Sequence, residues 1–244
     1  MIEQQRLSAA SMETLFQRLK TGGWRIVAPR ASGDTMSFSE VDSPRDMATG
    51  MIQTTLSPKS EVFPMWEELF RFRRTETGIE MTEPTAPIQP TVVFGVRPCD
   101  ARSLAALHAV FTWDYQDGPY LQRRAKVVLV GMSCAEADQC CFCTSVGGGP
   151  GDVTGSDLLL TSIGDDYLVE IVSERGRELA TLAGDLLGAV GDVDKAAHLA
   201  DVPVRFDVDQ LAKRLPRAFE QDDLWIEQSL RCLGCGACAY VCPT

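Results

Sequence analysis

Four closely spaced cysteines occupy the last thirteen residues of the chain. The sequence there is CLGCGACAYVCPT, and the cysteines are Cys232, Cys235, Cys238 and Cys242. The cysteines are separated by two, two and three residues, and proline follows the last one. Bacterial proteins bind [4Fe–4S] clusters with this spacing. In that arrangement three thiolates hold one cluster and the cysteine before proline ligates another. The spacing therefore predicts an iron–sulfur protein that carries electrons.

Zinc is the main alternative metal for this run, because it is also bound by four thiolates in tetrahedral geometry. Zinc sites usually pair two C-x2-C segments that lie about a dozen or more residues apart. The C-terminal run lacks that separation and has the ferredoxin spacing instead. Gly234, Gly236 and Ala237 agree with a cluster, since small residues let the backbone wrap closely and direct N–H groups at the sulfurs.

Composition limits the class of protein. The chain has 244 residues, of which 45% are hydrophobic and 23% are charged, so we expect an ordinary buried core. A net charge of -11 argues against a nucleic-acid surface. No apolar run approaches the length of about 18 residues needed to span a bilayer, and the start of the sequence lacks the pattern of an export signal. Nine cysteines, an odd number in two groups, indicate metal ligation in a reducing cytoplasm.

One segment has the pattern of a parallel βαβ unit. Residues 91–96 and 126–131 are apolar runs, and residues 101–111 between them have helical periodicity. Continuous apolar strands are typical of parallel sheets, which are buried on both faces. We therefore predict a main domain of the α/β (mixed α+β) class, followed by a C-terminal helical and partial ferredoxin-like 4Fe-4S segment.

Periodicity and turn residues predict the other elements. We expect strands at 24–28, 36–41, 158–161 and 167–172, and helices at 8–21, near 174–190, at 207–216 and at 219–230. The aromatic stripe at 63–72 indicates a helix that packs in the core or at an interface. The proline-rich residues 83–90 indicate an extended linker. The predicted units are an N-terminal α+β region (1–88), an α/β domain with a cysteine-rich site (89–205) and a helical segment with a truncated ferredoxin-type motif (206–244).

The five remaining cysteines gather around the βαβ unit. Cys99 and Cys134 each lie three residues past the end of a predicted strand, so both should emerge at the carboxyl edge of the sheet. Cys141 and Cys143 follow in a short loop, and four convergent thiolates could hold a second [4Fe–4S] cluster. Buried cysteines also serve as small hydrophobic residues. Spacing alone leaves Cys140 and Cys141 as equal candidates.

Neighbouring residues have more ordinary interpretations. We expect Asp100 to cap a helix and His108 to be packed or solvated. The loop 147–151, GGGPG, lacks the helix start and the Lys-Ser/Thr step of a phosphate loop, so we interpret it as a tight turn that lets the backbone approach a cluster or partner. Arg123 and Arg124 are either a surface pair or a contact for an acidic partner.

Three segments resemble a known family. They are RPCDARSLAAL (97–107), the stretch 117–124 that ends in two arginines, and SCAEADQCCFC (133–143) followed by a Gly-Pro loop. Together with the C-terminal run they resemble the iron–sulfur subunits typified by the one in anaerobic sulfite reductase, of the 4Fe-4S dicluster-domain family. The beta subunit of cytoplasmic NiFe sulfhydrogenases is similar. The likeness runs from about residue 50 to the end of the sequence.

The resemblance implies two ligand sets. Cys99, Cys134, Cys141 and Cys143 would hold a first cluster, and Cys232, Cys235, Cys238 and Cys242 would form the first half of a two-cluster ferredoxin domain. Here the resemblance selects Cys141 over Cys140. Family members continue into a second cysteine run, which this sequence does not contain.

The expected function is an electron relay in a cytoplasmic multi-subunit oxidoreductase. The resemblance implies a flavin- and NAD(P)-binding partner and a catalytic metalloenzyme subunit, hydrogenase-like or sulfite-reductase-like, with at least two [4Fe–4S] clusters in this chain. The sequence offers no catalytic Ser/His/Asp constellation, since His108 and His198 are its only histidines. A zinc-stabilised scaffold or binding module and a thiol redox protein are the alternatives.

Overall fold

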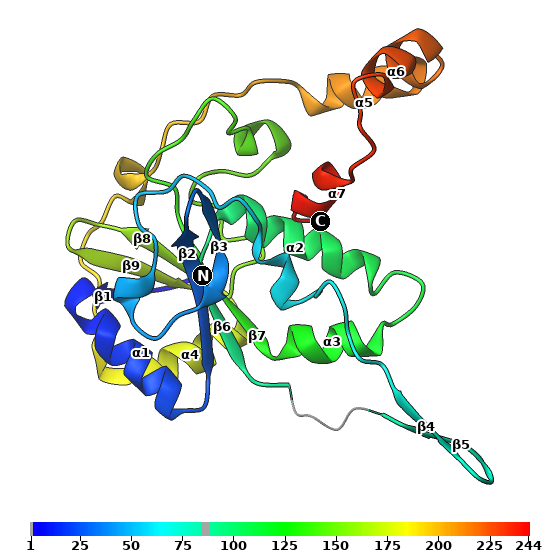
Figure 1. Ribbon diagram of the computed structural model, residues 1–244. Helices are drawn as coiled ribbons and strands as arrows, with labels where there is room; N and C mark the ends of the chain where they lie inside the picture. The colour runs from blue at the N-terminus through cyan, green and yellow to red at the C-terminus, as the bar shows by residue number, and fades with distance from the viewer. Residues whose placement is uncertain (1, 84–87) are drawn as a thin grey trace.

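A mixed eight-stranded sheet forms the centre of the computed structural model, which describes residues 2–83 and 88–244 (Figure 1). Its strand order is β10-β1-β9-β8-β7-β6-β2-β3. The strands are β1 (Glu3–Ser8), β2 (Arg25–Ser32), β3 (Thr35–Glu40), β6 (Thr91–Val96), β7 (Val127–Met132), β8 (Leu158–Ser162), β9 (Asp166–Ile171) and β10 (Leu187–Gly188). The pairs β2·β6, β6·β7 and β7·β8 are parallel, and the outer pairs are antiparallel.

Helices cover both faces of this sheet (Figure 1). Helices α1 (Met12–Thr21) and α4 (Glu174–Ala183) pack on one face, and α2 (Pro98–Val110) and α3 (Gly118–Ala125) pack on the other. The sheet thus has a hydrophobic cluster on each side, as the two-faced burial of its central strands requires. All six residues of β6 are buried.

The α/β class and the parallel βαβ unit are confirmed. The strand β6 occupies the predicted residues, and α2 and β7 begin and end within a few residues of their predicted limits. The predicted hairpin is β8·β9, and the two predicted N-terminal strands are β2 and β3. Strands of the predicted regions 1–88 and 89–205 pair in the same sheet, as β2 does with β6. The boundaries between the predicted units remain predictions.

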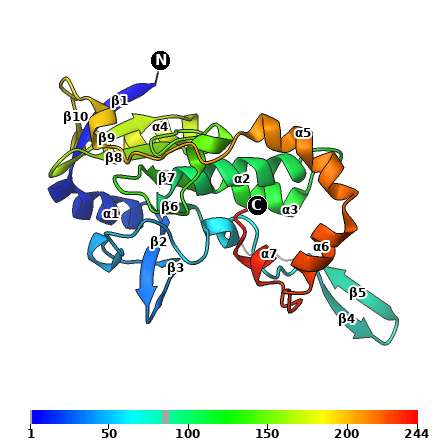
Figure 2. The same cartoon turned by 90° about the horizontal axis from the view of Figure 1, so that it is seen from above.

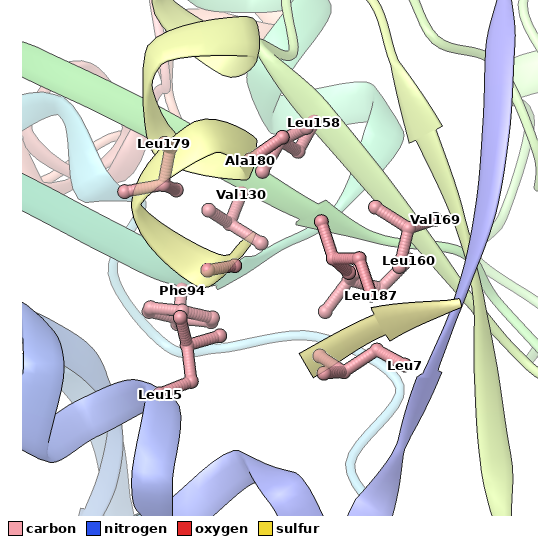
Figure 3. Close-up of a pocket in the computed structure, with 11 residues that line it drawn as sticks. Leu7, Leu15, Phe94, Val130, Leu158, Leu160, Val169, Leu179, Ala180 and Leu187 are labelled. Atoms are coloured by element: carbon pink, nitrogen blue, oxygen red, sulfur yellow. The ribbon is translucent and has the colours of Figure 1, made fainter. Parts of the chain in front are cut away.

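A small cavity lies in the core on the α1 and α4 side. Its volume is about 20 Å³, and only apolar side chains line it, among them Leu15, Phe94 and Val130 (Figure 3). The ring of Phe16 lies 5.0 Å from that of Phe94. The absence of any polar lining group marks this space as a packing gap in the core and not a site for a polar ligand.

The helix expected near 174–190 is shorter than predicted. Helix α4 ends at Ala183, because Gly184 takes a positive φ of 53°. A 3₁₀ turn (Gly184–Leu186) follows, and then β10 pairs with β1 at the edge of the sheet. The expected helix at 8–21 begins as a 3₁₀ turn (Ala9–Ser11) and continues as α1.

The predictions of a helix at 63–72 and of core packing for its aromatic stripe are wrong, whereas packing at an interface stays a prediction. Residues 66–70 are in neither helix nor strand, and Trp66 is 83% exposed. The ion pair of Glu67 with Arg123 and the packing of Phe63 on Phe111, with ring centroids 5.0 Å apart, attach the segment to α2 and α3, while Trp66, Phe70 and Phe72 are exposed. A separate hairpin of β4 (Arg71–Thr75) and β5 (Gly78–Thr82) follows. Of the predicted linker 83–90, residues 84–87 lie outside the described residues.

The C-terminal segment extends away from the sheet. Helices α5 (Val208–Phe219), α6 (Asp222–Ser229) and α7 (Ala237–Val241) contain no buried residue. Figures 1 and 2 show α5 and α6 at the end of the molecule beyond α2 and α3. The first two helices match the predicted ones, whereas a ferredoxin-like fold of the last residues is not established. Within the described residues, no helix is both long and apolar enough to cross a membrane.

Candidate metal centre

Two cysteines lie at the carboxyl edge of the parallel strands, as the sequence predicts. Cys99 is in the first turn of α2, directly after β6, and Cys134 follows β7 by two residues. The backbone of Cys134 is fixed on both sides: its N–H donates to the carbonyl oxygen of Pro150 at 2.9 Å, and its carbonyl accepts from the N–H of Ala200 at 2.8 Å. The two thiols are thus placed by rigid secondary structure and a braced loop.

Arg97 connects the ends of these two strands. Its Nη1 donates to the carbonyl oxygen of Ser133 at 3.1 Å, and its Nη2 donates to the carbonyl oxygen of Met51. Its Nε is buried and has no hydrogen-bond partner among the described residues. Arg97 was not among the predicted site residues. Its position between a buried strand and a helix that starts with Pro-Cys could have indicated it.

The loop with Cys141 and Cys143 is organised by Asp138. The Asp138 carboxylate accepts hydrogen bonds from the backbone N–H groups of Cys140, at 2.8 Å, and Cys141, at 3.0 Å. The Cys141 thiol lies 3.3 Å from the same oxygen. Cys143 then begins a 3₁₀ turn (Cys143–Val146). The side chain of Asp138 therefore fixes the turn that presents Cys141.

Arg205, from beyond the sheet, fastens this loop. Its backbone N–H donates to Ser145 Oγ at 2.8 Å, and its Nη2 donates to the carbonyl oxygen of Asp138 at 3.0 Å. Its Nε also donates to the carbonyl oxygen of Cys141. Arg205 thus ties the cysteine loop to the chain that leads into α5, through its guanidinium at Asp138 and Cys141 and through its backbone N–H at Ser145.

The four thiols predicted as ligands influence one another electrostatically. The pKa of Cys99 is raised to about 12, chiefly by burial and also by the nearby Asp100, Cys134 and Cys143. Burial also raises the pKa of Cys134; Arg97 opposes the shift, while Cys143 and Cys141 add to it. The pKa of Cys141 is raised first by burial and also by Cys143. Neutral thiols are therefore favoured at Cys99, Cys134 and Cys141 until a cation arrives.

Asp100 does not cap its helix, contrary to the sequence prediction. Helix α2 begins at Pro98 with Arg97 as its N-cap residue, so Asp100 lies inside the first turn. Burial raises the pKa of the Asp100 carboxyl to about 6, and the charge of Arg97 opposes this shift. A carboxyl group in this position adds negative potential beside the thiols.

The glycine-rich loop packs against the cysteine segment. Gly147 has a φ of 74°, and the N–H of Gly148 donates to the carbonyl oxygen of Cys143 at 2.9 Å. Arg102 donates from Nη1 to the carbonyl oxygen of Gly147 at 3.0 Å and pairs with Asp152 at 2.9 Å. These contacts agree with the predicted tight turn beside the cysteines.

The C-terminal cysteines lie on an exposed segment. Cys232, Cys235 and Cys238 are exposed and Cys242 is half-buried. Gly234 and Gly236 have φ values of 67° and 71°, left-handed conformations that glycine adopts without strain. The predicted wrapping of the backbone around a cluster stays a prediction.

This segment returns to the body of the protein at one place. Tyr240 donates from its hydroxyl to Met65 Sδ at 3.3 Å, and Lys59 Nζ lies 3.4 Å from the carbonyl oxygen of Thr244. Hydrogen bonds from Thr244 and the charge of Lys59 lower the pKa of Cys242. Over the described residues, no three or more Cys, His, Asp or Glu side chains form a group that could hold a metal ion. Both ligand sets therefore remain predictions.

Comparison with known proteins gives one relevant similarity. No protein-family model matches the sequence. The chain is similar to sulfhydrogenase 2 subunit beta of Pyrococcus furiosus, with 29% identity over 246 aligned residues that cover 98% of this chain and 71% of that protein. The similarity, which extends over nearly the whole chain, supports a relationship of the hydrogenase beta-subunit kind.

Proposed function

We propose that this chain is an iron–sulfur electron-transfer subunit of a cytoplasmic multi-subunit oxidoreductase. It would pass electrons between a flavin- and NAD(P)-binding partner and a catalytic metalloenzyme subunit of the hydrogenase or sulfite reductase type. The observation that carries the proposal is the placement of Cys99 and Cys134 together at the carboxyl ends of β6 and β7. The similarity to a sulfhydrogenase beta subunit supports the same class of complex.

The residues at this edge suit an iron–sulfur cluster. Four cysteines supply the thiolates, and Cys99, Cys134, Cys141 and Cys143 would hold the cluster. The Nε of Arg97 is buried and has no hydrogen-bond partner among the described residues, so it can donate a charge-assisted hydrogen bond near these cysteines. The sulfur atoms of an anionic cluster accept hydrogen bonds of this kind. When bound, a [4Fe–4S] cluster supplies one-electron redox chemistry.

The protein's own contribution is to fix the ligands and to tune their surroundings. Asp138 and Arg205 hold the loop of Cys141 and Cys143 in one conformation. Arg97 places a positive charge next to Cys134, and Asp100 opposes it with a carboxyl group. Nearby charges and burial are the means by which a protein sets a cluster's potential.

The C-terminal run would supply ligands for at least one further [4Fe–4S] cluster. Its cysteines are Cys232, Cys235, Cys238 and Cys242, and their spacing supports this assignment. The exposure of the run is consistent with a role at the surface, where electrons enter or leave toward a partner subunit. The chain would therefore carry two or more clusters.

Anaerobic purification with measurement of iron and acid-labile sulfide tests the proposal. We expect at least two clusters for each chain, visible absorption that dithionite bleaches, and two separable EPR signals. Cys141→Ala should remove one signal and about half of the iron, if the chain carries two clusters. The adjacent substitution Cys140→Ala is the matched control and should leave both signals intact.

Three results would contradict this assignment. Stoichiometric zinc without iron would indicate a zinc-stabilised scaffold or binding module. Thiol exchange activity that survives iron removal would indicate a thiol redox protein. Loss of the signal in Cys140→Ala but not in Cys141→Ala would exchange the ligand assignment. Mass spectrometry of proteins that copurify with the native chain tests the proposed partners.

A further inference from the structure

A second cavity has none of the cysteines in its lining. Between α2 and α3 there is a cavity of about 380 Å³. His108, near the C-terminal end of α2, lines it, whereas Cys99 lies in the first turn of the same helix. Arg124 also lines it, and this residue precedes β7, whereas Cys134 follows β7. The cavity is therefore separate from the candidate metal centre.

Three nitrogen-bearing side chains face this cavity. They are His108, Arg124 and Arg175, contributed by α2, α3 and α4. Arg175 donates from Nη1 to the carbonyl oxygen of Arg124 at 2.8 Å, which brings its guanidinium close to α3. Burial lowers the pKa of Arg124, and the charge of Arg175 lowers it further. The same two arginines, after burial, lower the pKa of His108. Positive charge is thus concentrated at the cavity wall.

Of these three side chains, only Arg175 forms an ion pair with a carboxylate among the described residues. Arg175 lies 3.2 Å from the buried carboxylate of Asp157. Arg124 donates from Nη1 to the carbonyl oxygen of Val127 at 3.0 Å, and no carboxylate among the described residues forms an ion pair with it. The charge of Asp157 does raise the pKa of Arg124, but no carboxylate of the described residues contacts this partly buried guanidinium directly, and burying a charge with incomplete compensation is costly.

Two polar atoms beside the cavity also lack partners. His108 Nδ1 and Tyr120 Oη are buried and make no hydrogen bond within the described parts of the chain. The two rings lie 5.8 Å apart, and Tyr120 is near enough to Arg124 for the arginine's charge to lower the tyrosine's pKa, against the larger effect of burial. Buried polar groups in proteins are almost always hydrogen-bonded, so unpaired ones mark a place where a ligand or water belongs.

The remaining wall of the cavity is apolar. Leu104 and Ala105 contribute it from α2, and Leu121 and Ala125 from α3. Gly155 closes one side with a φ of 85°, and a Cβ there would lie 2.1 Å from the carbonyl oxygen of Ala101, so only glycine allows this approach. A cavity with one cationic and one apolar wall fits a ligand with an anionic group on an apolar body.

We propose that this cavity binds a small organic anion. The guanidinium groups of Arg124 and Arg175 would hold its phosphate or carboxylate group, and its apolar body would lie against Leu104 and Leu121. Arginine suits both groups, because its planar fork matches two of their oxygens. The chain as a whole carries a net charge of -11, so general attraction of anions does not account for such binding.

Calorimetric titration of the full chain, purified anaerobically, tests this site. Phenyl phosphate and benzoate present an anionic group on a ring, whereas inorganic phosphate presents the anion alone and phenol the ring alone. We expect one site for phenyl phosphate or benzoate with a dissociation constant of about 1 mM or lower. Phenol should not bind, and the stronger of the two anions identifies the group that the site prefers.

Three variants locate the binding. Arg124→Gln should weaken binding about tenfold or more, since a hydrogen bond to a charged group is lost. Ala105→Trp should block the cavity while both arginines remain. Arg123→Gln is the matched control: Arg123 bonds to Glu67 and to the carbonyl oxygen of Val62, so binding should not change. The proposal is overturned if no anion binds the unaltered chain at about 10 mM, or if Arg123→Gln weakens binding as much as Arg124→Gln.

Discussion

Arg97 Nη1 donates a hydrogen bond to the carbonyl oxygen of Ser133, 3.1 Å away, and this contact joins the carboxyl ends of β6 and β7. Cys99 follows Arg97 by two residues and Cys134 follows Ser133 directly, so the bond positions the two cysteines relative to each other. It also brings a permanent positive charge to the thiols, since the guanidinium stays protonated at any ordinary pH. One side chain thus has a structural and an electrostatic effect at the candidate metal centre.

Replacement of Arg97 by methionine should lower the midpoint potential of the cluster proposed at that edge. A positive charge favours the reduced, more negative form of a cluster, so its removal favours the oxidised form. We expect a shift on the order of 50 mV toward negative potential. Arg97→Lys keeps the charge and should shift the potential much less. An EPR-monitored redox titration measures both, and equal potentials in Arg97→Met and the unaltered protein would show that the charge has no such role.

Asp157 should be essential for stability. Its carboxylate is buried and accepts from the N–H of Leu129 at 2.9 Å and from Ser173 Oγ at 2.5 Å, besides its ion pair with Arg175. Asp157→Ala leaves these donors unpaired and should reduce the free energy of unfolding by about 2–4 kcal/mol. Urea denaturation measures this change. Asp42→Ala removes the exposed partner of Lys20 and serves as the control, for which we expect little change.

The central elements were predictable from the sequence because their burial is complete. The strands β6 and β7 are continuous apolar runs, which few other structures can accommodate. The strand β1 was missed, since its sequence EQQRLS buries only Leu7 and its partner β9 lies some 160 residues later. Its pairing is a tertiary effect that no local pattern reveals.

The candidate metal centre also has a part that was predictable from the sequence and a part that was not. Cys99 and Cys134 could be placed at one edge because parallel strands have a fixed polarity. The roles of Arg97, Asp138 and Arg205 depend on how far each side chain reaches across loops, and composition or spacing does not contain that information. The error at 63–72 has a related cause: the ion pair of Glu67 with Arg123 and a single aromatic contact, Phe63 on Phe111, attach that segment, and its aromatic spacing does not reveal either.

Glu61 should make stability depend on pH. Burial raises the pKa of its carboxyl above the usual value, although the ion pair with Arg25 opposes the shift. Between the unfolded and folded pKa values the folded chain therefore binds more protons, so the free energy of unfolding should rise as the pH falls from neutral through the folded pKa. Denaturation over a pH series should show this rise for the unaltered protein and a weaker one for Glu61→Gln.

A second variant checks the origin of that effect. The negative charge of Glu40 contributes to the raised pKa of Glu61. Glu40→Gln should therefore move the pH-dependent interval to lower pH without removing it. An unchanged interval in Glu40→Gln together with an unchanged profile in Glu61→Gln would assign the pH dependence to other groups.

Two glycines with similar backbone conformations should respond very differently to substitution by alanine. Gly155 and Gly164 have φ values of 85° and 77°, so alanine is strained at both, at a cost of roughly 1–2 kcal/mol. At Gly164 nothing lies within 4 Å of the added Cβ, and the cost should stop there. At Gly155 the Cβ would lie 2.1 Å from the carbonyl oxygen of Ala101, which belongs to the backbone of α2 and cannot turn aside. Gly155→Ala should therefore lower the free energy of unfolding by at least about 2 kcal/mol more than Gly164→Ala, because α2 must shift. Parallel urea denaturation of the two variants measures the difference, and equal losses would mean that the close approach of residue 155 to α2 does not exist in solution.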